Sequence, residues 1–408
     1  MLKPAKPTAT TSTLALPFVL AKRLVNSSVM AGLLLLSSQS LVHAQAVPTP
    51  ADAAIDNAQD AAQETAQDAV QDAAQDAAQD AVQDAVQQDN DAAFVAWLAE
   101  FRAAALERGI RAETLDRVLP TISQERQVVQ ADRNQAEFVN TYANYLQRVN
   151  TSRIEAGKRL MQTHGDMIRE VSAEYGVQHR FVVSIMGLES NYGAFPITQP
   201  LFSVIATLAY DGRRGEMFRN ELFAALEIVD RGLATPEMMK SSWAGALGII
   251  QFTPSSFLRL AVDHDKDGKI DLWSMGPDVI ASVANYLRSH GWQQDQTWGR
   301  VVSLPPGGEQ SLQAPQEAGL TPDAACQSFT TTGAWRSLND WQELGVRRAN
   351  GSVLPTRDLQ AALIIGDEGD DKGYLVYRNF CSIMRYNPAF RYALSVGLLA
   401  DALDDIRD

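Results

Sequence analysis

Apolar side chains that recur every three or four residues constrain the fold of this chain most strongly. Such a repeat marks one face of an α-helix, and it runs with interruptions from residue 94 to residue 289. Residues 298–377 differ, because their Gly, Pro, Thr and short alternating runs are typical of strands. The pattern predicts a mainly α (α+β) protein with a small β-rich piece before its last helix. We expect helices at residues 94–109, 114–119, 137–160, 165–175, 181–189, 217–230, 277–289 and 390–403.

Negative charge is concentrated in one segment near the N-terminus, and the rest of the sequence is more balanced. Residues 51–91 hold eleven Asp and Glu and neither Lys nor Arg, out of a net charge of −14 for all 408 residues. The remainder is only mildly acidic, and no basic patch indicates a nucleic-acid partner. It is long enough for one large domain or for two to three smaller ones.

Residues 1–46 are typical of an export signal. Four Lys and Arg between Lys3 and Arg23 precede a short apolar stretch at residues 30–36, and Ala44-Gln45-Ala46 fits a cleavage site. A transmembrane anchor is the alternative, but serines interrupt the apolar run well short of ~20 residues. No cysteine stands at the cleavage site to carry a lipid. We therefore expect export to the periplasm, without lipidation and without a stable membrane span.

Residues 47–92 are expected to form an acidic spacer. A tetrapeptide of Ala, Ala or Val, Gln and Asp repeats over residues 61–87. Alanine favours a helix, but these small side chains bury too little apolar surface to offset the entropy of ordering the segment. We interpret the segment as a solvated helical or disordered spacer; the alternative is a contact with a partner protein.

Two cysteines, Cys326 and Cys381, are the whole thiol content of the chain. In an oxidising compartment such a pair can close a disulfide. Two buried free thiols are the alternative, and the sequence leaves both open.

Glu189 is the candidate catalytic residue. It ends an apolar helical run in which Phe181, Val182, Ile185 and Met186 share its face. Both burial beside these residues and the negative end of the helix dipole raise the pKa of a carboxyl group, as a general acid for glycosidic cleavage requires. The alternative is an exposed glutamate before the turn Ser190-Asn191-Tyr192-Gly193.

A second motif spans residues 241–252. Small residues at Gly245, Ala246 and Gly248 let the backbone approach a ligand closely, while Gln251 can hydrogen-bond a sugar and Trp243 can pack on a sugar face. A tight contact between helices would explain the glycines alone.

A third motif, residues 263–271, matches the front half of an EF-hand loop. Asp263, Asp265 and Asp267 take positions 1, 3 and 5, and the Lys269 carbonyl takes position 7. Position 12 is a serine, so the usual closing glutamate is missing and Asp278 is the nearest replacement. The loop predicts a structural Ca²⁺ site, with an acidic surface turn as the alternative.

In order and spacing, these motifs resemble the membrane-bound lytic murein transglycosylase B family, glycoside hydrolase family 103. The resemblance covers about residues 94–400 and includes Arg153–Gly157, Ser282–Leu287, His290-Gly291-Trp292 and Tyr386-Asn387. It implies a lysozyme-like helical core, an adjoining helical domain and a small inserted β-rich domain. On this resemblance we expect a helical domain at residues 93–160, a catalytic core at 161–295, a β-rich domain at 296–376 and the end of the core at 377–408.

The resemblance also implies roles for single residues. Glu189 matches the single catalytic glutamate, and Asp263, Asp265, Asp267, the Lys269 carbonyl and Asp278 match the calcium site. The residues that match the lining of the glycan cleft are Ser242, Gln251, Tyr286, Tyr386, Asn387 and Tyr392.

The implied reaction cleaves the bond between N-acetylmuramic acid and N-acetylglucosamine in peptidoglycan and leaves 1,6-anhydromuramic ends. Glu189 would act first as an acid and then as a base, with no organic cofactor. A hydrolytic lysozyme and a non-catalytic peptidoglycan-binding protein are the alternatives. Peptidoglycan glycan strands are the expected partner, wall-remodelling proteins are possible ones, and we expect a monomer.

Overall fold

The computed structural model describes residues 90–133, 145–308, 312, 335–365 and 372–404. The expected export signal, most of the acidic spacer and Cys326 lie outside these described residues. The chain divides into two compact units, residues 1–79 and 80–408, and every described residue belongs to the second. No helix in the described ranges combines the length and the apolar composition that crossing a membrane requires.

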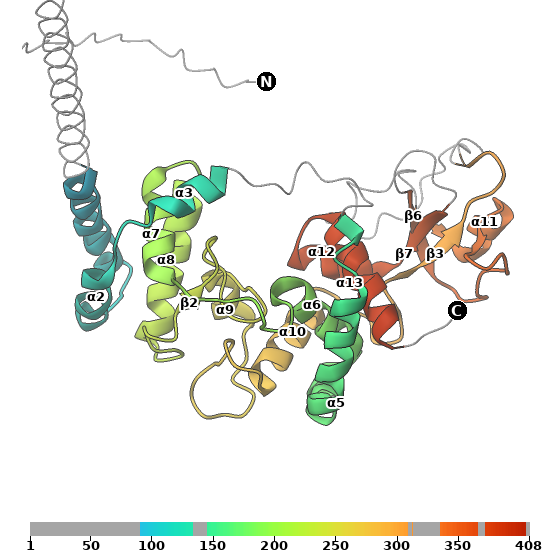
Figure 1. Cartoon of the computed structure of the whole chain (residues 1–408), viewed down its shortest axis with the longest axis horizontal. Coiled ribbons are helices and arrows are strands. Elements are labelled where there is room, and N and C mark those ends of the chain that lie inside the picture. Colours follow the sequence, from blue (N-terminus) through green and yellow to red (C-terminus); the bar gives the residue numbers. More distant parts are fainter. Residues whose placement is uncertain (1–89, 134–144, 309–311, 313–334, 366–371, 405–408) are drawn as a thin grey trace, which may run out of the picture. The chain divides into compact units, whose positions relative to one another are not determined.

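The second unit is mostly helical, as predicted (Figure 1). A helix of residues 90–107 opens it, and its bounds and those of the later helices fit the apolar repeats. The other helices of the helical part are α2 (Ala112–Val118), α3 (Arg126–Arg133), α5 (Thr151–Glu174), α6 (His179–Ser190), α7 (Leu201–Asp211), α8 (Gly215–Asp230), α9 (Pro254–Leu260), α10 (Pro277–Ser289), α12 (Arg378–Tyr386) and α13 (Phe390–Leu403), with a 3₁₀ turn at Leu119–Thr121.

The expected helices over residues 137–160 and 165–175 are wrong in their bounds. The described part of the first leaves the helical conformation before Asn150, whose side chain accepts a hydrogen bond from the Arg153 backbone N–H at 2.9 Å. Asparagine at this position caps the start of a new helix. That helix, α5, then continues through Gly165, because one interior glycine costs only about 1 kcal/mol.

Helix α6 lies at the centre of the helical core. Every residue of α6 except His179 and Glu189 is buried, and the helix packs against α5, α10 and α13. A helix that is apolar on all sides must be surrounded by other elements. Glu189 is therefore the one side chain at its C-terminal end that reaches a partly open space.

The predicted β-rich piece forms a five-stranded antiparallel sheet in the order β4-β6-β7-β3-β5. The strands are β3 (Gly299–Ser303), β4 (Arg336–Ser337), β5 (Arg347–Arg348), β6 (Gln360–Ile365) and β7 (Lys372–Val376), and α11 (Leu338–Glu343) follows β4. The sheet has a hydrophobic cluster of its own around Trp341, Leu363 and Leu375. A separate pair, β1 (Gln199–Pro200) and β2 (Lys240–Ser241), lies in the helical part.

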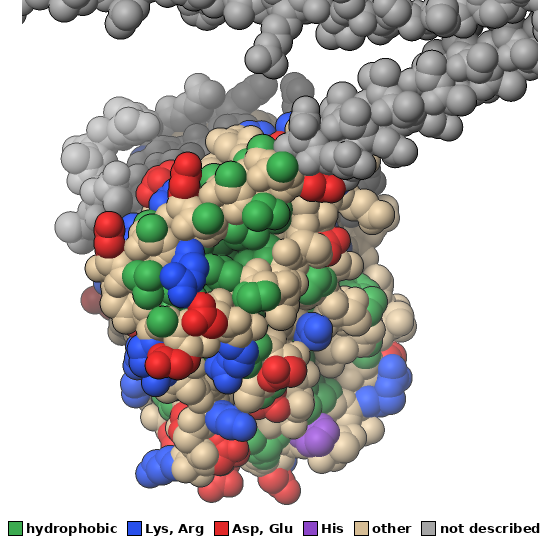
Figure 2. Space-filling view, turned by 90° about the vertical axis from the view of Figure 1, so that its left-hand side faces the viewer, with side chains coloured by type: hydrophobic (Ala, Val, Ile, Leu, Met, Phe, Trp, Pro, Cys, Tyr) green, Lys and Arg blue, Asp and Glu red, His purple; other side chains and the backbone are tan. Residues whose placement is uncertain are grey.

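The first helix is attached to the core by aromatic rings. Trp97 stacks on Phe94 and Phe101, and Phe101 stacks on Phe223 of α8 with ring centroids 4.5 Å apart. Figure 2 shows the face that carries this helix, where hydrophobic side chains gather among charged ones. Val95 and Leu106 of this helix are 63% and 40% exposed.

Candidate active site

The chain reverses direction directly after Glu189. Asn191 ends α6 in the left-handed conformation at φ 52°, and Tyr192 follows at φ 61°. Their backbone N–H groups donate to the carbonyls of Gly187 and Met186 at 3.1 Å each. The bond from Asn191 to Gly187 is the one that defines an αL motif at the end of a helix. The Gly193 N–H donates to the Ser190 hydroxyl at 2.8 Å. These bonds fix the turn that carries Glu189.

Tyr192 anchors this turn to the neighbouring helix. Its ring lies against two glycines, Gly157 of α5 and Gly187 of α6, and a Cβ at either position would overlap the ring. Its hydroxyl donates to the Arg153 carbonyl at 3.0 Å, and burial raises the pKa of Tyr192. The Arg153 guanidinium donates to the Asn191 side chain at 3.4 Å. Helix α5 thereby holds Asn191 and Tyr192, the second and third residues after Glu189.

Two tyrosines from the end of the chain face Glu189, which is itself half-buried. Burial, and then the negative charge of Glu189, raise the pKa of Tyr386 well above its usual range. The same two causes act in the same order on the pKa of Tyr392. The carboxyl group therefore lies in a low-dielectric space beside two neutral phenols, although nearly the whole second half of the chain separates them in sequence.

The segment with Gln251 is a closed turn. Leu247 and Phe252 exchange backbone hydrogen bonds of 2.7 and 3.1 Å across it, and Gln251 stands at φ 52°. Gly248, at φ +65°, packs so closely on the Leu272 backbone that any side chain would collide with it.

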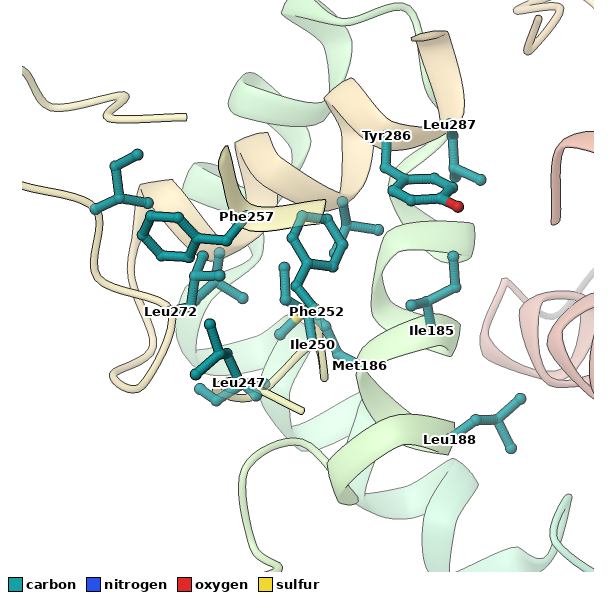
Figure 3. Close-up of a cluster of buried hydrophobic side chains, with 14 of the residues drawn as sticks. Ile185, Met186, Leu188, Leu247, Ile250, Phe252, Phe257, Leu272, Tyr286 and Leu287 are labelled. Atoms are coloured by element: carbon teal, nitrogen blue, oxygen red, sulfur yellow. The ribbon is translucent and has the colours of Figure 1, made fainter. Parts of the chain in front are cut away.

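The turn rests on an apolar cluster. Figure 3 shows Ile250 and Phe252 beside Met186 of α6. The side-chain Nε2 of Gln251 donates to the Gly248 carbonyl at 2.9 Å. The side-chain oxygen of Gln251 has no hydrogen-bond donor in the described part of the chain. That oxygen is available to accept a bond from a ligand.

Ser242 and Trp243 precede this turn. The Ser242 N–H donates to the Ala246 carbonyl at 2.9 Å, and the Ser242 hydroxyl accepts from the Ala246 N–H at 3.3 Å. The Trp243 side chain is among the few large apolar groups that stay open to solvent, at 38% exposure. Trp243 therefore offers an aromatic surface beside the Gln251 turn.

The three predicted cleft tyrosines come together, and the hydroxyls of two of them, Tyr286 and Tyr386, bind backbone carbonyls. The rings of Tyr286 and Tyr386 lie 4.7 Å apart, and Tyr386 stacks on Tyr392 at 6.4 Å. The Tyr386 hydroxyl donates to the Ile250 carbonyl at 2.5 Å, and the Tyr286 hydroxyl donates to the Arg385 carbonyl. Tyr386 and Tyr286 thus tie the ends of distant segments together around Glu189.

Asn387 lies in the link between α12 and α13. Its side-chain oxygen accepts a bond from the Ala389 N–H at 3.1 Å, so it shapes this link. Its contact with a ligand stays a prediction, as do the ligand-binding roles of Ser242, Gln251 and the three tyrosines.

The EF-hand-like motif folds into an acidic cluster. Oxygens of Asp263, Asp265 and Asp278 lie within 4.8 Å of one another. Asp278, at the start of α10, is 4% exposed and accepts the backbone N–H groups of His264 and Asp271 at 2.7 and 2.9 Å. Burial raises the pKa of Asp278, and the negative charge of Asp265 adds a smaller effect in the same direction. The two backbone hydrogen bonds lower that pKa but do not cancel the rise.

One oxygen of Asp263 is buried without a hydrogen-bond partner in the described ranges. Uncompensated carboxylate oxygens at such spacing fit a hard cation with oxygen ligands. Asp267 lies outside this group, and its carboxylate accepts the Lys269 N–H at 2.8 Å. The role of the Lys269 carbonyl stays a prediction.

Cys381 is buried in α12 and is disulfide-bonded. Cys326, the other cysteine of the sequence, lies outside the described residues.

Sequence reasoning missed the residues that support the site. Tyr192 belongs to the turn Ser190-Asn191-Tyr192-Gly193, but the sequence analysis did not predict that its ring lies between two helices. The sequence feature that could have indicated this is a glycine in each helix, Gly157 in α5 and Gly187 in α6. Nothing in the spacing pointed to Glu221 of α8, whose carboxylate accepts hydrogen bonds from the Ser255 N–H and hydroxyl at 2.8 and 2.7 Å.

Comparisons with known proteins identify the family of this chain. A family model described as "Transglycosylase SLT domain" matches residues 93–401. The membrane-bound lytic murein transglycosylase B of Escherichia coli (strain K12) is 32% identical over 259 residues, which are 61% of this chain and 63% of that protein.

Solved structures share the fold. SltB3 from Pseudomonas aeruginosa in complex with NAG-NAM-pentapeptide has a TM-score of 0.68 and 38% identity over 76% of this chain and 79% of its own. Soluble lytic transglycosylase SltB1 from Pseudomonas aeruginosa has a TM-score of 0.62 and 28% identity over 76% of this chain and 98% of its own. The Escherichia coli lytic transglycosylase Slt35 in complex with calcium has a TM-score of 0.60 and 26% identity, over 75% of this chain and 92% of its own. They confirm the mainly α, lysozyme-like fold.

Proposed function

The chain belongs to the Transglycosylase SLT domain family, and from this we propose that it is a lytic transglycosylase of peptidoglycan. It would cleave the β-1,4 bond between N-acetylmuramic acid and N-acetylglucosamine and leave a 1,6-anhydromuramic end. The relatives support this proposal, since one is a lytic murein transglycosylase and another was solved with a NAG-NAM-pentapeptide.

The observation that carries the proposal is the single carboxyl group of the site. The segments that build it are residues 179–193, 241–252, 282–287 and 378–392, and Glu189 is their only Asp or Glu. A glycosidase that activates water or forms a glycosyl-enzyme uses two carboxylates. One half-buried glutamate beside neutral phenols instead supports a mechanism in which a single group is used twice.

In the first step protonated Glu189 donates its proton to the glycosidic oxygen as the bond to the anomeric carbon breaks. The muramyl N-acetyl oxygen assists at that carbon in place of a protein nucleophile. In the second step the Glu189 carboxylate removes the proton from the C6 hydroxyl of the same sugar. The C6 oxygen bonds to the anomeric carbon as the bond from that carbon to the N-acetyl oxygen breaks. Glu189 regains its proton and no water is consumed. Acid-base catalysis of this kind contributes about 10²–10⁴-fold in rate.

The neighbouring groups would bind the glycan. The Gln251 oxygen can accept a hydrogen bond from a sugar hydroxyl or an N-acetyl N–H, and the exposed Trp243 ring can pack on a sugar face. The closed turns beside Gly193 and Gly248 would keep these groups in place while the substrate enters.

Mass analysis of peptidoglycan digested in ¹⁸O-labelled water tests the reaction. We expect anhydromuramic ends without the label, and we expect Glu189→Gln to abolish product formation. Labelled reducing ends would establish a hydrolytic muramidase instead. Binding to peptidoglycan by a wild-type protein that forms no product would leave only a binding role. Glu227→Gln, on the exposed side of α8 beside Arg231, serves as the matched control.

We propose that the acidic cluster holds a structural Ca²⁺. Asp263, Asp265 and Asp278 would supply ligands directly, with Asp267 and the Lys269 carbonyl joining on binding. The related Escherichia coli enzyme was solved in complex with calcium, and the buried, unpartnered oxygen of Asp263 supports the same ion here. The bound cation would fix the loop and would take no part in the reaction.

The remaining features of the proposal follow from the sequence. The signal at residues 1–46 supports export to the periplasm without lipidation, where peptidoglycan strands are the partner, and the acidic spacer at residues 47–92 would separate signal and enzyme. We propose a monomer that can act beside wall-remodelling proteins, with a helical domain at 93–160, a core at 161–295 and 377–408, and a β-rich domain at 296–376. Fractionation of cells that express the full chain tests the location.

A further inference from the structure

Helix α9 begins three residues after Gln251, at Pro254, and a side chain of α8 binds its first turn. Three backbone N–H groups open this helix after Pro254, which has none. The Ser256 N–H donates to the Thr253 hydroxyl at 3.2 Å and the Phe257 N–H to the Thr253 carbonyl at 2.9 Å. The third, on Ser255, donates to the Glu221 carboxylate at 2.8 Å.

Glu221 binds the same residue twice. Its second oxygen accepts the Ser255 hydroxyl at 2.7 Å, and that hydroxyl also lies 3.1 Å from the Thr253 hydroxyl. A carboxylate at a helix N-terminus interacts favourably with the helix dipole, and hydrogen bonds to a charged acceptor are the strong ones. Glu221 therefore fixes where α9 starts.

Other elements hold the Gln251 turn on both sides of Gln251, and the start of α9 is one of these points. The Ile249 N–H donates to the Leu272 carbonyl at 2.7 Å, and the Tyr386 hydroxyl donates to the Ile250 carbonyl at 2.5 Å. Both of these contacts lie before Gln251 in the sequence. After Gln251, the Phe252 ring packs against the rings of Tyr286 and Tyr386. The first residue after Gln251 that hydrogen-bonds a side chain of another element is Ser255, through Glu221. Gln251 itself is in the left-handed conformation at φ 52°, which persists only where the surroundings impose it.

From this arrangement we infer that Glu221 is a positioning residue for substrate binding: it holds α9 so that the side-chain oxygen of Gln251 meets the glycan. The inference rests on the proposed function. It names a residue outside the glycan site that affects how tightly the site binds glycan. Glu221 touches no substrate. Its contribution passes entirely through Ser255 and the turn to Gln251.

A double-mutant cycle with Gln251→Ala tests the inference on the full chain, with soluble glycan fragments as substrate. We expect Glu221→Ala to raise KM about three- to tenfold, the range that one misplaced hydrogen bond supports, while kcat changes little. We expect no further rise in KM when Glu221→Ala is added to Gln251→Ala, because coupled residues are non-additive. Glu221→Gln keeps an acceptor for the Ser255 N–H and a partner for its hydroxyl, and we expect it to restore KM.

Two controls separate this role from general stabilisation. Glu227→Ala lies on the same helix, and we expect it to leave KM unchanged. Equal rises in KM from Glu221→Ala in the wild-type and Gln251→Ala backgrounds would overturn the inference, and so would a lowered Tm with unchanged KM. Failure of the proposed reaction would be seen separately, as labelled reducing ends or as activity in Glu189→Gln.

Discussion

Replacing Gly187 by alanine provides the sharpest test of how α5 and α6 hold the catalytic turn. Alanine is normally favoured over glycine inside a helix by about 1 kcal/mol. At Gly187, however, the new Cβ would lie 2.7 Å from the hydroxyl and ring carbon Cζ of Tyr192. These distances are shorter than van der Waals contact, so the ring must move.

The ring has little room to move. On its other side a Cβ at Gly157 would lie 2.5 Å from the same hydroxyl, and the hydroxyl is bound to the Arg153 carbonyl at 3.0 Å. Overpacking a buried site costs about 1–3 kcal/mol, and losing the hydrogen bond costs a further ~0.5–1.5 kcal/mol. After subtraction of the helix gain, we expect Gly187→Ala to lower the free energy of unfolding by about 1–3 kcal/mol.

Gly165→Ala in α5 is the matched control. There the new Cβ meets only the guanidinium of Arg169, at 2.9 Å, and that flexible side chain is half exposed beside Asp166. We expect Gly165→Ala to be neutral or to stabilise by up to about 1 kcal/mol.

Urea unfolding of both variants measures the difference, together with activity on peptidoglycan, which we expect to fall in Gly187→Ala because Tyr192 follows Glu189 by three residues. A Gly187→Ala protein as stable as Gly165→Ala would refute the packing account. In a Tyr192→Ala background the cost of Gly187→Ala should disappear.

Two further predictions concern the metal loop and the exposed indole. Calcium at about 100 times its Kd should stabilise the protein by ~2.7 kcal/mol and raise Tm by several degrees, while Asp263→Asn should remove that rise; a Tm insensitive to calcium and chelator alike would contradict the site. Trp243→Ala should raise KM for glycan by about three- to tenfold through loss of ring contact and leave Tm unchanged, and an unaltered KM would show that the indole does not touch substrate.

The sequence predicted the helices with strong apolar repeats well. Residues 277–289 and 390–403 were expected as helices, and the structure has Pro277–Ser289 and Phe390–Leu403. The α7 helix went unpredicted because it is buried along nearly its whole length, which removes the alternation between polar and apolar faces. Short helices such as α9 and α12 hold too few turns for a repeat to show.

The sequence indicated those candidate residues whose role depends on a single segment. It did not indicate contacts between segments that are far apart in the sequence. Glu189 and the aspartates of the loop could be named as candidates from the sequence because helix position and ligand spacing are local properties. Tyr386 was expected to line the glycan cleft, but the sequence did not indicate that its hydroxyl binds the Ile250 carbonyl. The role of Glu221 could not be predicted because its partner Ser255 belongs to another helix, and no sequence spacing connects the two residues.

The Tyr386–Ile250 hydrogen bond also bears on the order in which the protein can mature. The turn that holds Gln251 is completed by a residue made more than a hundred positions later, after the entire β-rich segment. Contacts of such sequence separation form late, because the loop between them must close first. During synthesis the helices around α6 can associate, but Glu189 gains its neighbours Tyr386 and Tyr392 only when the last helices dock. The chain would therefore stay unable to cut glycan until its C-terminal segment has been made and has folded back.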